Sequence, residues 1–319
     1  MNLKLARYRA DTCLRFIVER MTLSTPALAF TDLSPALRIA HTLVTDMSAI
    51  ASPPEVCLKV KSLLADESST LADLAAIIVR DPALAARVLR LVNSSWYGLV
   101  ARVDTISRAV VVLGMDELQK IVCAMSAVNT FSRLDGGVTN MNSFWRHGVY
   151  TGLVAQAIAR RVGVLHPERL FVAGVMHDIG TLIINHRYPE IAEETIRQAA
   201  GDEHQLALIE MAELGFDHAQ LGGLMLEHWQ LPVSIVDAIC WHHEPTAAHL
   251  APIEAAILNM ADNVANESGT GNFSELPGPG SQWDPTLLTR LGLNVNFDID
   301  TIMDDVDREY VETICLFLN

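Results

Sequence analysis

The stretch "FVAGVMHDIGTLIINH", residues 171–186, decides how the rest of the chain is interpreted. It begins as an apolar helix and places His177 and Asp178 side by side at the end of that helix. Buried ionisable groups are costly unless they are paired, hydrogen-bonded or bound to a metal ion. The pair is therefore either a local hydrogen-bonding feature or part of a metal site, and other residues must decide between the two.

Composition predicts a globular protein with a large core. The chain has 319 residues, half of them hydrophobic, and its mean hydropathy is +0.25. The formal net charge of −15 argues against nucleic-acid binding, which needs a basic face that neutralises phosphates. A small phosphorylated ligand beside a metal ion remains compatible with this charge.

The five cysteines are scattered and never form a Cys-x-x-Cys pair, which fits a reducing cytoplasm and argues against a disulfide framework. No run of about 18 uncharged apolar residues indicates a membrane span. Residues 1–20 are basic, but charges interrupt their apolar residues. We expect an amphipathic packing helix there and not a signal peptide.

Helical spacing dominates the first half. Thr70 can cap a helix that has Asp73 in its first turn. Asp81 can cap the next helix, with Pro82 at its first position. Two short helices therefore meet at Arg80–Asp81, as in a compact bundle. Their apolar stripes follow the i, i+3, i+4, i+7 pattern and comprise Leu71, Leu74, Ala75 and Ile78, then Leu84, Val88, Leu91 and Val92.

Residues 110–112 are three consecutive valines, which are also typical of a buried strand. Gly114 indicates a helix end and Met115–Met125 a further helix. Because no second β-branched run lies nearby to pair with the valines, we expect a helix. The chain is thus predicted to be all-α, a compact multi-helix bundle.

Turn-rich segments divide the chain. Residues 130–143 and 267–285 collect glycine, serine, asparagine, aspartate or proline. We expect an N-terminal helical extension (1–49), a central domain (50–265) with halves at 50–135 and 136–265, and a linker with an acidic C-terminal helix (266–319). Helices in the second half are expected at 144–162, 167–177, 189–199, 203–213, 217–228, 232–242 and 252–265.

Five of these helices point a histidine or an aspartate toward the interior. His177 follows Leu170, Ala173 and Gly174 at helical spacing, and the other four residues share apolar stripes in the same way. Imidazole and carboxylate are ligands of divalent transition metals, and separate helices can bring them to one core site. Asp178 could bridge two ions about 3.5–4 Å apart. The five inward residues are His147, His177, His218, His242 and Asp262.

An inward histidine can equally be a hydrogen-bonded core residue. His228 also lies on an inward stripe and is interpreted as structural, so the helix face alone does not identify a ligand. The remaining histidines lie near expected helix ends or loops and are expected in solvent, namely His166, His186, His204 and His249.

The segments "MHDIG" and, about 30 residues earlier, "FWRH" resemble the HD superfamily of metal-dependent phosphohydrolases. The match is nearer to its HDOD branch, the HD-related output domain. Residues 52–98 look like the first half of that domain. The second half is matched in order by "FWRHGVYTGLVAQAIARRVG", "LFVAGVMHDIG", "ELGFDHAQLGGLMLEHWQLP", "VDAICWHHEP" and "ILNMADNVAN". The resemblance covers about residues 50–265.

This resemblance implies metal ligands at His147, His177, Asp178 and Asp262. In the related HD-GYP branch, which cleaves cyclic dinucleotides, further ligands match His218 and either His242 or His243. It therefore implies one or two divalent ions of iron, manganese, zinc or nickel.

Two departures argue against cyclic di-GMP hydrolysis. Thr181 stands where HD-GYP enzymes commonly carry a lysine that can hold a substrate phosphate. The Gly-Tyr-Pro element is also missing, because Pro245 and Thr246 follow the His-His-Glu segment. Lys120 and Arg146 are alternative phosphate-binding cations, although each is interpreted as a surface charge.

Asn93, Ser94, Trp96 and Tyr97 close a predicted helix in the first half. They are either the lining of a partner groove or a helix end whose aromatics pack against the second half. We favour the helix end, with Gly98 allowing the turn.

Three functions remain open. The first, which the resemblance implies, is a cytoplasmic bacterial signal-transduction module that has a protein partner. Its acidic C-terminal helix could pack on itself or on another subunit and so form a homo-oligomer. The second is a metal-dependent phosphohydrolase acting on a nucleotide or phosphodiester, with Asp178 bridging the ions and His243 as a further ligand or general acid. The third is a helical adaptor whose histidines are core residues.

Overall fold

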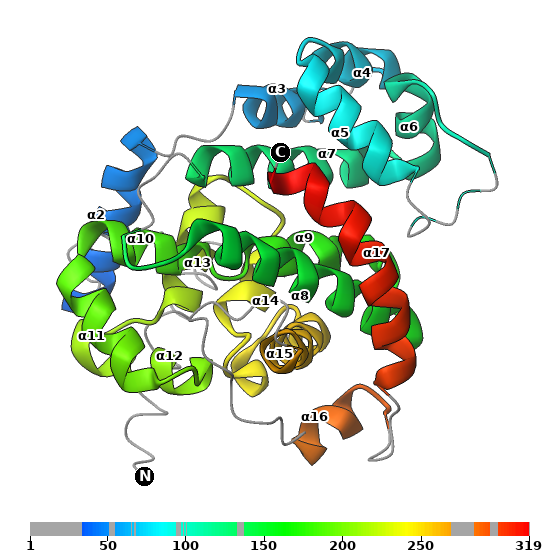
Figure 1. The fold of residues 1–319 in the computed structure, drawn as a ribbon. Helices are drawn as coiled ribbons and strands as arrows, with labels where there is room; N and C mark the ends of the chain where they lie inside the picture. The colour runs from blue at the N-terminus through cyan, green and yellow to red at the C-terminus, as the bar shows by residue number, and fades with distance from the viewer. Residues whose placement is uncertain are drawn as a thin grey trace.

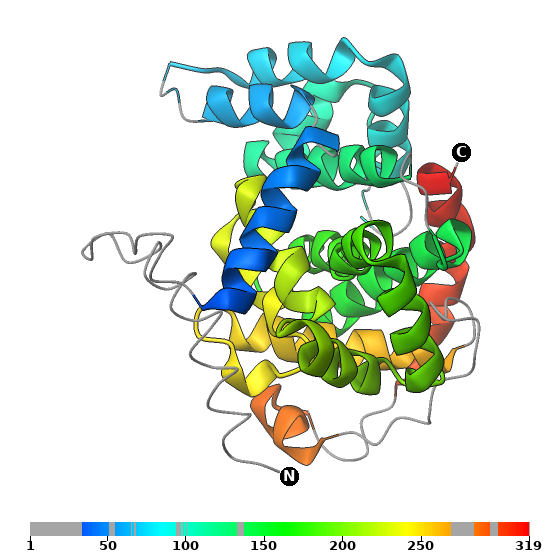
Figure 2. The ribbon, with the colours of Figure 1, turned by 90° about the vertical axis from the view of Figure 1, so that its left-hand side faces the viewer.

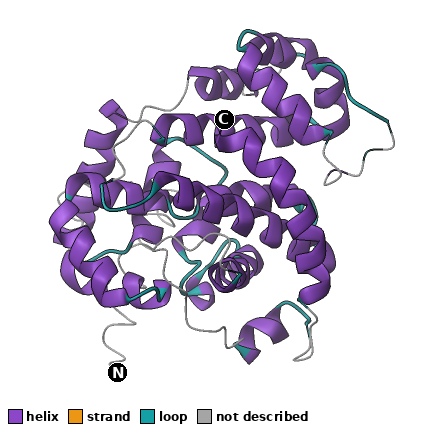
Figure 3. Ribbon diagram, in the orientation of Figure 1, coloured by secondary structure: helices purple, strands orange, loops and turns teal. Residues whose placement is uncertain are grey.

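The computed structural model describes residues 34–50, 55–64, 66, 68–93, 97, 99, 101–132, 137–268, 284–293 and 299–318. Within these ranges the secondary structure is helical and no strand occurs (Figure 3). The all-α prediction is therefore confirmed. The helix expected at residues 1–20 lies outside the described ranges.

The first half of the domain is a group of short helices packed over one longer helix (Figure 1). Helix α7 forms the base of this group, with contacts to α3, α5 and α6, while α4 packs mainly on α3 and α6. The bounds are α3 Glu55–Leu64, α4 Leu71–Val79, α5 Pro82–Val92, α6 Ile106–Leu113 and α7 Met115–Phe131.

Side-chain caps fix the start of these helices as the sequence predicts. The Thr70 hydroxyl accepts a hydrogen bond from the backbone N–H of Asp73, and the Asp73 carboxylate accepts one from the N–H of Thr70 at 2.9 Å. The Asp81 carboxylate accepts a 3.0 Å bond from the N–H of Leu84. Satisfying these free N–H groups stabilises a helix end by about 1 kcal/mol.

The valine run lies in helix α6, so the strand alternative is wrong. Val110 is fully buried, whereas Val111 is 68% exposed, as expected for neighbouring positions on an amphipathic helix. Thr105 caps the start of α6, and Gly114 ends it with a φ of 83°. A positive φ is readily adopted by glycine, which lets α7 begin at once in a new direction.

The second half is a bundle around α8 and α15, which contact each other (Figure 1). Each predicted helix end agrees with the structure to within three residues. Helix α10 was not predicted, because the chain was expected to leave the helical state after His177. The bounds are α8 Met141–Arg161, α9 Glu168–Met176, α10 Ile179–Arg187, α11 Pro189–Ala199, α12 Glu203–Leu214, α13 His218–His228, α14 Val233–Cys240, η3 Pro245–Ala247 and α15 Pro252–Glu267.

Glycines allow the helices of this bundle to approach very closely. A Cβ placed on Gly174 of α9 would lie 2.4 Å from the Cα of Gly152 on α8. A Cβ on Gly180 of α10 would lie 2.0 Å from the carbonyl oxygen of His218 on α13. Neither helix pair could pack this closely with a larger residue, so the glycines set which functional side chains become neighbours.

Helices outside residues 50–265 pack onto the bundle. Helix α2 (Pro35–Ile50) contacts α10 and α13, and α16 (Pro285–Arg290) contacts α15. Helix α17 (Asp300–Leu318) lies along α8 and reaches α5 and α7 (Figures 1 and 2). The C-terminal helix thus touches both halves of the domain.

Within the described ranges, none of the helices is sufficiently long and apolar to span a membrane. Cys57, Cys123, Cys240 and Cys315 are free thiols, and Cys13 lies outside these ranges.

Candidate metal centre

All seven predicted metal ligands come together in the interior of the second half. His147 comes from α8, His177 and Asp178 from the α9–α10 junction, and Asp262 from α15. His243 is partly exposed, and the other six residues are buried, namely His147, His177, Asp178, His218, His242 and Asp262.

The first group of side chains surrounds the imidazoles of His147 and His177. Their Nε2 atoms lie 3.2 Å apart. The Nε2 of His147 lies 3.1 Å from Oδ1 of Asp262, and the Nε2 of His177 lies 3.1 Å from Oδ2 of Asp178. Four potential ligand atoms from three separate parts of the chain therefore face one point.

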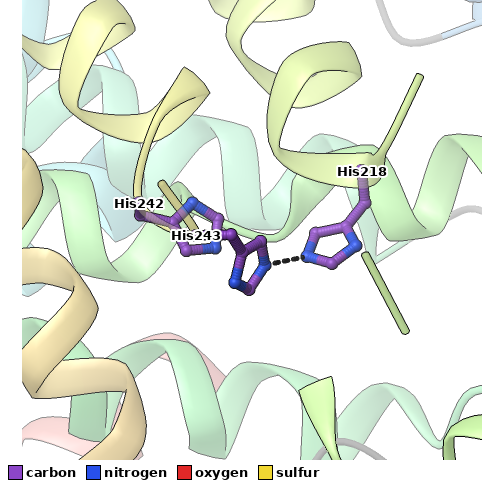
Figure 4. A group of neighbouring side chains, drawn as sticks. All are labelled: His218, His242 and His243. Carbon is purple, nitrogen blue, oxygen red and sulfur yellow. Dashed lines mark hydrogen bonds between the residues drawn. The ribbon is translucent and has the colours of Figure 1, made fainter. Parts of the chain in front are cut away.

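The second group consists of three imidazoles, those of His218, His242 and His243 (Figure 4). The Nε2 atoms of His218 and His243 lie 2.8 Å apart, and one ring nitrogen from each residue lies within 4.8 Å of the others. His218 is the first residue of α13, and His242 and His243 lie in the turn that follows α14. This separation is compatible with a shared cation.

Asp178 lies between the two groups. Its Oδ2 faces the first group, at 3.1 Å from Nε2 of His177 and 3.5 Å from Nε2 of His147. Its Oδ1 faces the second group, at 3.6 Å from Nε2 of His218 and 3.9 Å from Nε2 of His242. A carboxylate with one oxygen toward each ligand group has the geometry needed to bridge two ions.

The residues fit a metal because two of their inward atoms have no hydrogen-bond partner. Within the described part of the chain, Oδ1 of Asp178 and Nε2 of His242 are buried without a hydrogen bond. Buried polar atoms are nearly always satisfied, so such atoms require an explanation. A cation between the two groups would satisfy both.

The outer nitrogens of the imidazoles are held by hydrogen bonds. Nδ1 of His177 donates to the carbonyl of Gly174 at 2.7 Å, and Nδ1 of His242 donates to the carbonyl of Ile239 at 2.8 Å. Nδ1 of His218 donates to the buried carboxylate of Glu210 at 2.7 Å. Such bonds fix the ring orientation and leave Nε2 available to a metal, as is usual for metal-binding histidines.

Without a metal, the acidic side chains hold protons on two imidazoles. Burial opposes the charged form of His177, but Asp178 and Asp262 outweigh it and raise its pKa to about 10. Burial likewise opposes the charged form of His218, but Glu210 and Asp178 raise its pKa to about 9. A metal at this site must therefore displace protons.

The other imidazoles behave in the opposite way. Burial and the nearby charge of His177 lower the pKa of His242 to about 4. Burial and the neighbouring histidines lower the pKa of His243 well below its usual range. Although burial alone would raise it, the pKa of Asp262 is lowered by its contacts with His147 and His177. His243 is thus neutral at neutral pH and suits a ligand or proton acceptor better than the general acid considered from the sequence.

Sequence reasoning missed Glu203, the first residue of α12. Its side chain is buried, and one of its oxygens lies within 4.8 Å of ligand atoms of His147, His177 and Asp262. Asn266 donates a 2.5 Å hydrogen bond to Oε2 of Glu203. An acidic residue in the first turn of a helix is common, so the sequence gave no distinctive signal.

The structure also shows the positions of the other histidines and of the two cations considered as phosphate ligands. His228 is exposed, so its assignment to an inward stripe is wrong. Lys120 forms an ion pair with Glu117 at 3.1 Å, and Nε of Arg146 donates to the hydroxyl of Tyr310 at 3.1 Å, which places both cations away from the cluster. The histidines expected in solvent are exposed in three cases (His166, His204 and His249) and partly buried in one (His186).

Asn93 ends α5 as expected. Its side-chain amide donates to the carbonyl of Val103 at 2.6 Å, and its carbonyl oxygen accepts from the N–H of Val103 at 2.7 Å. These bonds fasten the helix end to the following loop. Ser94 and Trp96 lie outside the described residues.

The helical fold and the adjacent His177–Asp178 pair at the centre of the bundle define a domain of the HD type. The model of the HDOD domain matches residues 50–245, and the chain belongs to the HDOD family. The predicted family is confirmed.

Solved structures support the same assignment. The chain is similar to a "Putative phosphohydrolase" of Shewanella amazonensis SB2B, with 27% identity, a TM-score of 0.64 and coverage of 86% of this chain and 96% of the other. It is equally similar to an "HDOD domain protein with unknown function" of Geobacter sulfurreducens, with 26% identity, a TM-score of 0.64 and coverage of 89% and 100%.

A curated relative is an "Uncharacterized protein" of Treponema pallidum (strain Nichols), 27% identical over 211 residues. These residues are 65% of this chain but 40% of the relative, so the chain spans about two fifths of the relative's length.

Proposed function

We propose that this HDOD protein is a bacterial regulatory module whose second half binds two divalent transition-metal ions. The observation that supports this most directly is the position of Asp178, with one carboxylate oxygen toward each ligand group. The partnerless buried atoms of Asp178 and His242 support it independently.

The ligands divide into two sets that share Asp178. His147, His177 and Asp262 would hold one ion, while His218, His242 and His243 would hold the other. Mixed nitrogen and oxygen ligands suit iron, manganese, zinc or nickel. When bound, such ions act as Lewis acids that polarise a phosphoryl oxygen or lower the pKa of a water molecule.

The phosphate-binding cations considered from the sequence do not serve the cluster in the described part of the chain, which favours a regulatory module over a hydrolase. Thr181 is buried and neutral where the related enzymes carry a lysine. Arg146 and Lys120 are engaged elsewhere. Phosphate recognition generally relies on a cationic side chain or on a set of free backbone N–H groups. The site therefore suits a role in which the metal stabilises the fold and the folded domain binds a signalling partner.

A second candidate function is hydrolysis of a nucleotide or another phosphodiester. A pocket of about 120 Å³ reaches the cluster and is lined in part by His243, Asp262 and Asn263. The similar Shewanella protein is named a "Putative phosphohydrolase", and the match covers 96% of its length. In this role His243 would accept a proton at the pocket, and Asp178 would hold both ions.

Elemental analysis of protein purified without a histidine tag tests the metal proposal. We expect close to two ions per chain in the wild type and a loss of at least one in His177→Ala. His228→Ala is the matched control, because His228 is exposed. Substoichiometric metal in the wild type that is unchanged in His177→Ala would leave the helical adaptor as the remaining function.

Activity measurements separate the two metal-dependent functions. A generic phosphodiester and cyclic dinucleotides would be incubated with the metal-loaded protein, with and without added Mn²⁺ or Fe²⁺. The regulatory proposal expects no turnover above that of Asp178→Asn. Turnover that disappears in Asp178→Asn would establish the hydrolase instead.

A further inference from the structure

The buried carboxylate of Glu203 is the strongest feature that the expected ligand set does not include. It belongs to neither of the metal-ligand sets that the family resemblance implies. Its side chain is 6% exposed, and its carboxylate takes part in two sets of ligand atoms that lie within 4.8 Å of one another, one with His147, His177 and Asp262 and one with Asp178 and His218.

The short connection between α11 and α12 delivers this carboxylate. Ala200 and Gly201 both have positive φ angles, of 50° and 89°, so the chain reverses sharply after α11. The Asp202 side chain then caps α12 by accepting a hydrogen bond from the N–H of Gln205. Glu203 is thereby fixed at the first position of the helix, facing the cluster.

Asn266 holds the Glu203 side chain in place. Its Nδ2 donates to Oε2 of Glu203 at 2.5 Å and lies 3.1 Å from Oδ1 of Asp262. Asn266 follows Asp262 by one helical turn on α15. A single amide therefore ties Glu203 to an expected metal ligand, and neither carboxylate can turn away without losing this bond.

Charge provides a further argument. Glu203, Asp178 and Asp262 are three carboxyl groups in one buried cluster, and the described ion pairs of Asp178 and Asp262 are with histidines and not with arginine or lysine. Without a metal, protonated His177 and His218 can balance two of the three charges, and burial together with Asp178 and Asp262 raises the pKa of Glu203 well above its usual range. Buried like charges repel strongly unless cations compensate them. Two divalent ions would balance more negative charge than Asp178 and Asp262 supply.

We propose that Glu203 is an additional ligand of the metal centre, which it closes on the side of the pocket, and that Asn266 is its positioning residue. This inference rests on the proposed metal centre. The pocket is lined by Glu203 together with His243, Asp262 and Asn266, so an anion that approaches the ions through the pocket would face the Glu203 carboxylate. Glu203 would thus take the position that an incoming phosphate needs.

Metal affinity of Glu203→Gln, measured by competition with a chromogenic chelator using Zn²⁺ and Mn²⁺, tests the proposal. Loss of a residue that only orients a metal ligand typically lowers the metal affinity by about 10- to 100-fold. We expect the loss of a direct ligand in Glu203→Gln to lower it by at least this much. Asn266→Ala should lose less, because it removes only the positioning bond. Glu213→Gln is the matched control, since Glu213 is exposed on the same helix.

Thermal unfolding of the metal-free variants separates a ligand from a structural residue. Burial and the nearby Asp178 and Asp262 raise the pKa of Glu203 well above its usual range, so the metal-free site disfavours the charged carboxylate. The neutral amide of Glu203→Gln should therefore leave the metal-free melting temperature equal to or above that of the wild type, while the stabilisation by added metal should shrink. Wild-type affinity in Glu203→Gln, or lower metal-free stability with unchanged affinity, would overturn this inference and leave the metal centre intact. A wild type that binds no metal would instead overturn both.

Discussion

The hydroxyl of Tyr150 on α8 donates a 2.7 Å hydrogen bond to the carboxylate of Asp307 on α17. Tyr150 lies one turn after His147, so the C-terminal helix contacts the same helix that carries the proposed metal ligand His147. The rings of Tyr150 and Tyr310 also meet edge to face, with centroids 5.2 Å apart. Helix α17 therefore packs against α8, the helix that carries His147, and stabilises its position.

Tyr150→Phe should destabilise the protein by about 1 kcal/mol, because it removes one hydrogen bond and lets the exposed Asp307 return to water. Metal stoichiometry should not change, since Tyr150 faces α17. Thermal unfolding and elemental analysis check the two parts. Asp304→Asn, at an exposed position on the same helix, is the control. Loss of metal in Tyr150→Phe would show that α17 controls ligand geometry and not only stability.

Glu210→Gln should weaken metal binding by about 10- to 100-fold without removing any ligand. The Glu210 carboxylate accepts hydrogen bonds from both the backbone N–H and Nδ1 of His218, at 2.8 and 2.7 Å. A neutral amide would hold the imidazole less firmly and lower the basicity of its Nε2. Chelator competition measures the change. An affinity equal to that of wild type would mean that the ring is oriented by packing alone.

Gly180→Ala should lower the free energy of unfolding by about 1–3 kcal/mol or more, because the new Cβ would lie 2.0 Å from the backbone of α13. Relief of the clash would also separate Asp178 from His218, so metal affinity should fall as well. Gly222→Ala is a graded comparison, since its nearest atom would lie 3.2 Å away. Denaturant unfolding and chelator competition provide the measurements. Equal losses in both variants would contradict the role of close packing at Gly180.

The contribution of His177, His218 and His242 to the stability of the metal-free protein should be greatest near pH 6.5. His177 and His218 have folded pKa values of about 10 and 9, above the unfolded value of about 6.5. Their contribution is complete below pH 6.5 and is lost as the pH rises toward 9–10. His242, with a folded pKa of about 4, binds its proton more readily when unfolded, so stability also falls from pH 6.5 toward 4.

Melting temperatures between pH 4 and 10 in the presence of a chelator check this profile. Bound metal should remove the alkaline decline, because the ions replace the protons on His177 and His218. His177→Ala should flatten the alkaline limb without a metal. A stability that rises steadily from pH 6.5 to 10 in the metal-free protein would contradict the assignment.

Local signals were sufficient to predict most of the fold. The caps at Thr70 and Asp81 and the regular spacing of apolar residues are short-range features, and the corresponding helices form where they were expected. Helix α10 was missed because its residues are buried nearly all around, so it has no polar face to reveal a helical period. His228 was misplaced because a helix end can turn away from the core while its apolar spacing continues.

The candidate site was predictable only in part. His147 and Asp262 lie on apolar stripes, so the residue spacing within a single helix was enough to predict that they face the interior. The closeness of Asp178 to His218 depends on the crossing of α10 and α13 at Gly180, and this is a tertiary property. Glu203 depends on the turn at Ala200 and Gly201 and on Asn266 from α15, so no pattern within its own helix could identify it.

The cluster gathers side chains from α8, α13 and α15, from the α9–α10 junction and from the turn after α14, all within residues 141 to 267. An ion held there would act as a cross-link among these segments and would bind only the folded chain. Mass action then couples the folded population to the concentration of free metal. In a cell starved of the metal, the unfolded fraction would rise and proteases would shorten the lifetime of the protein.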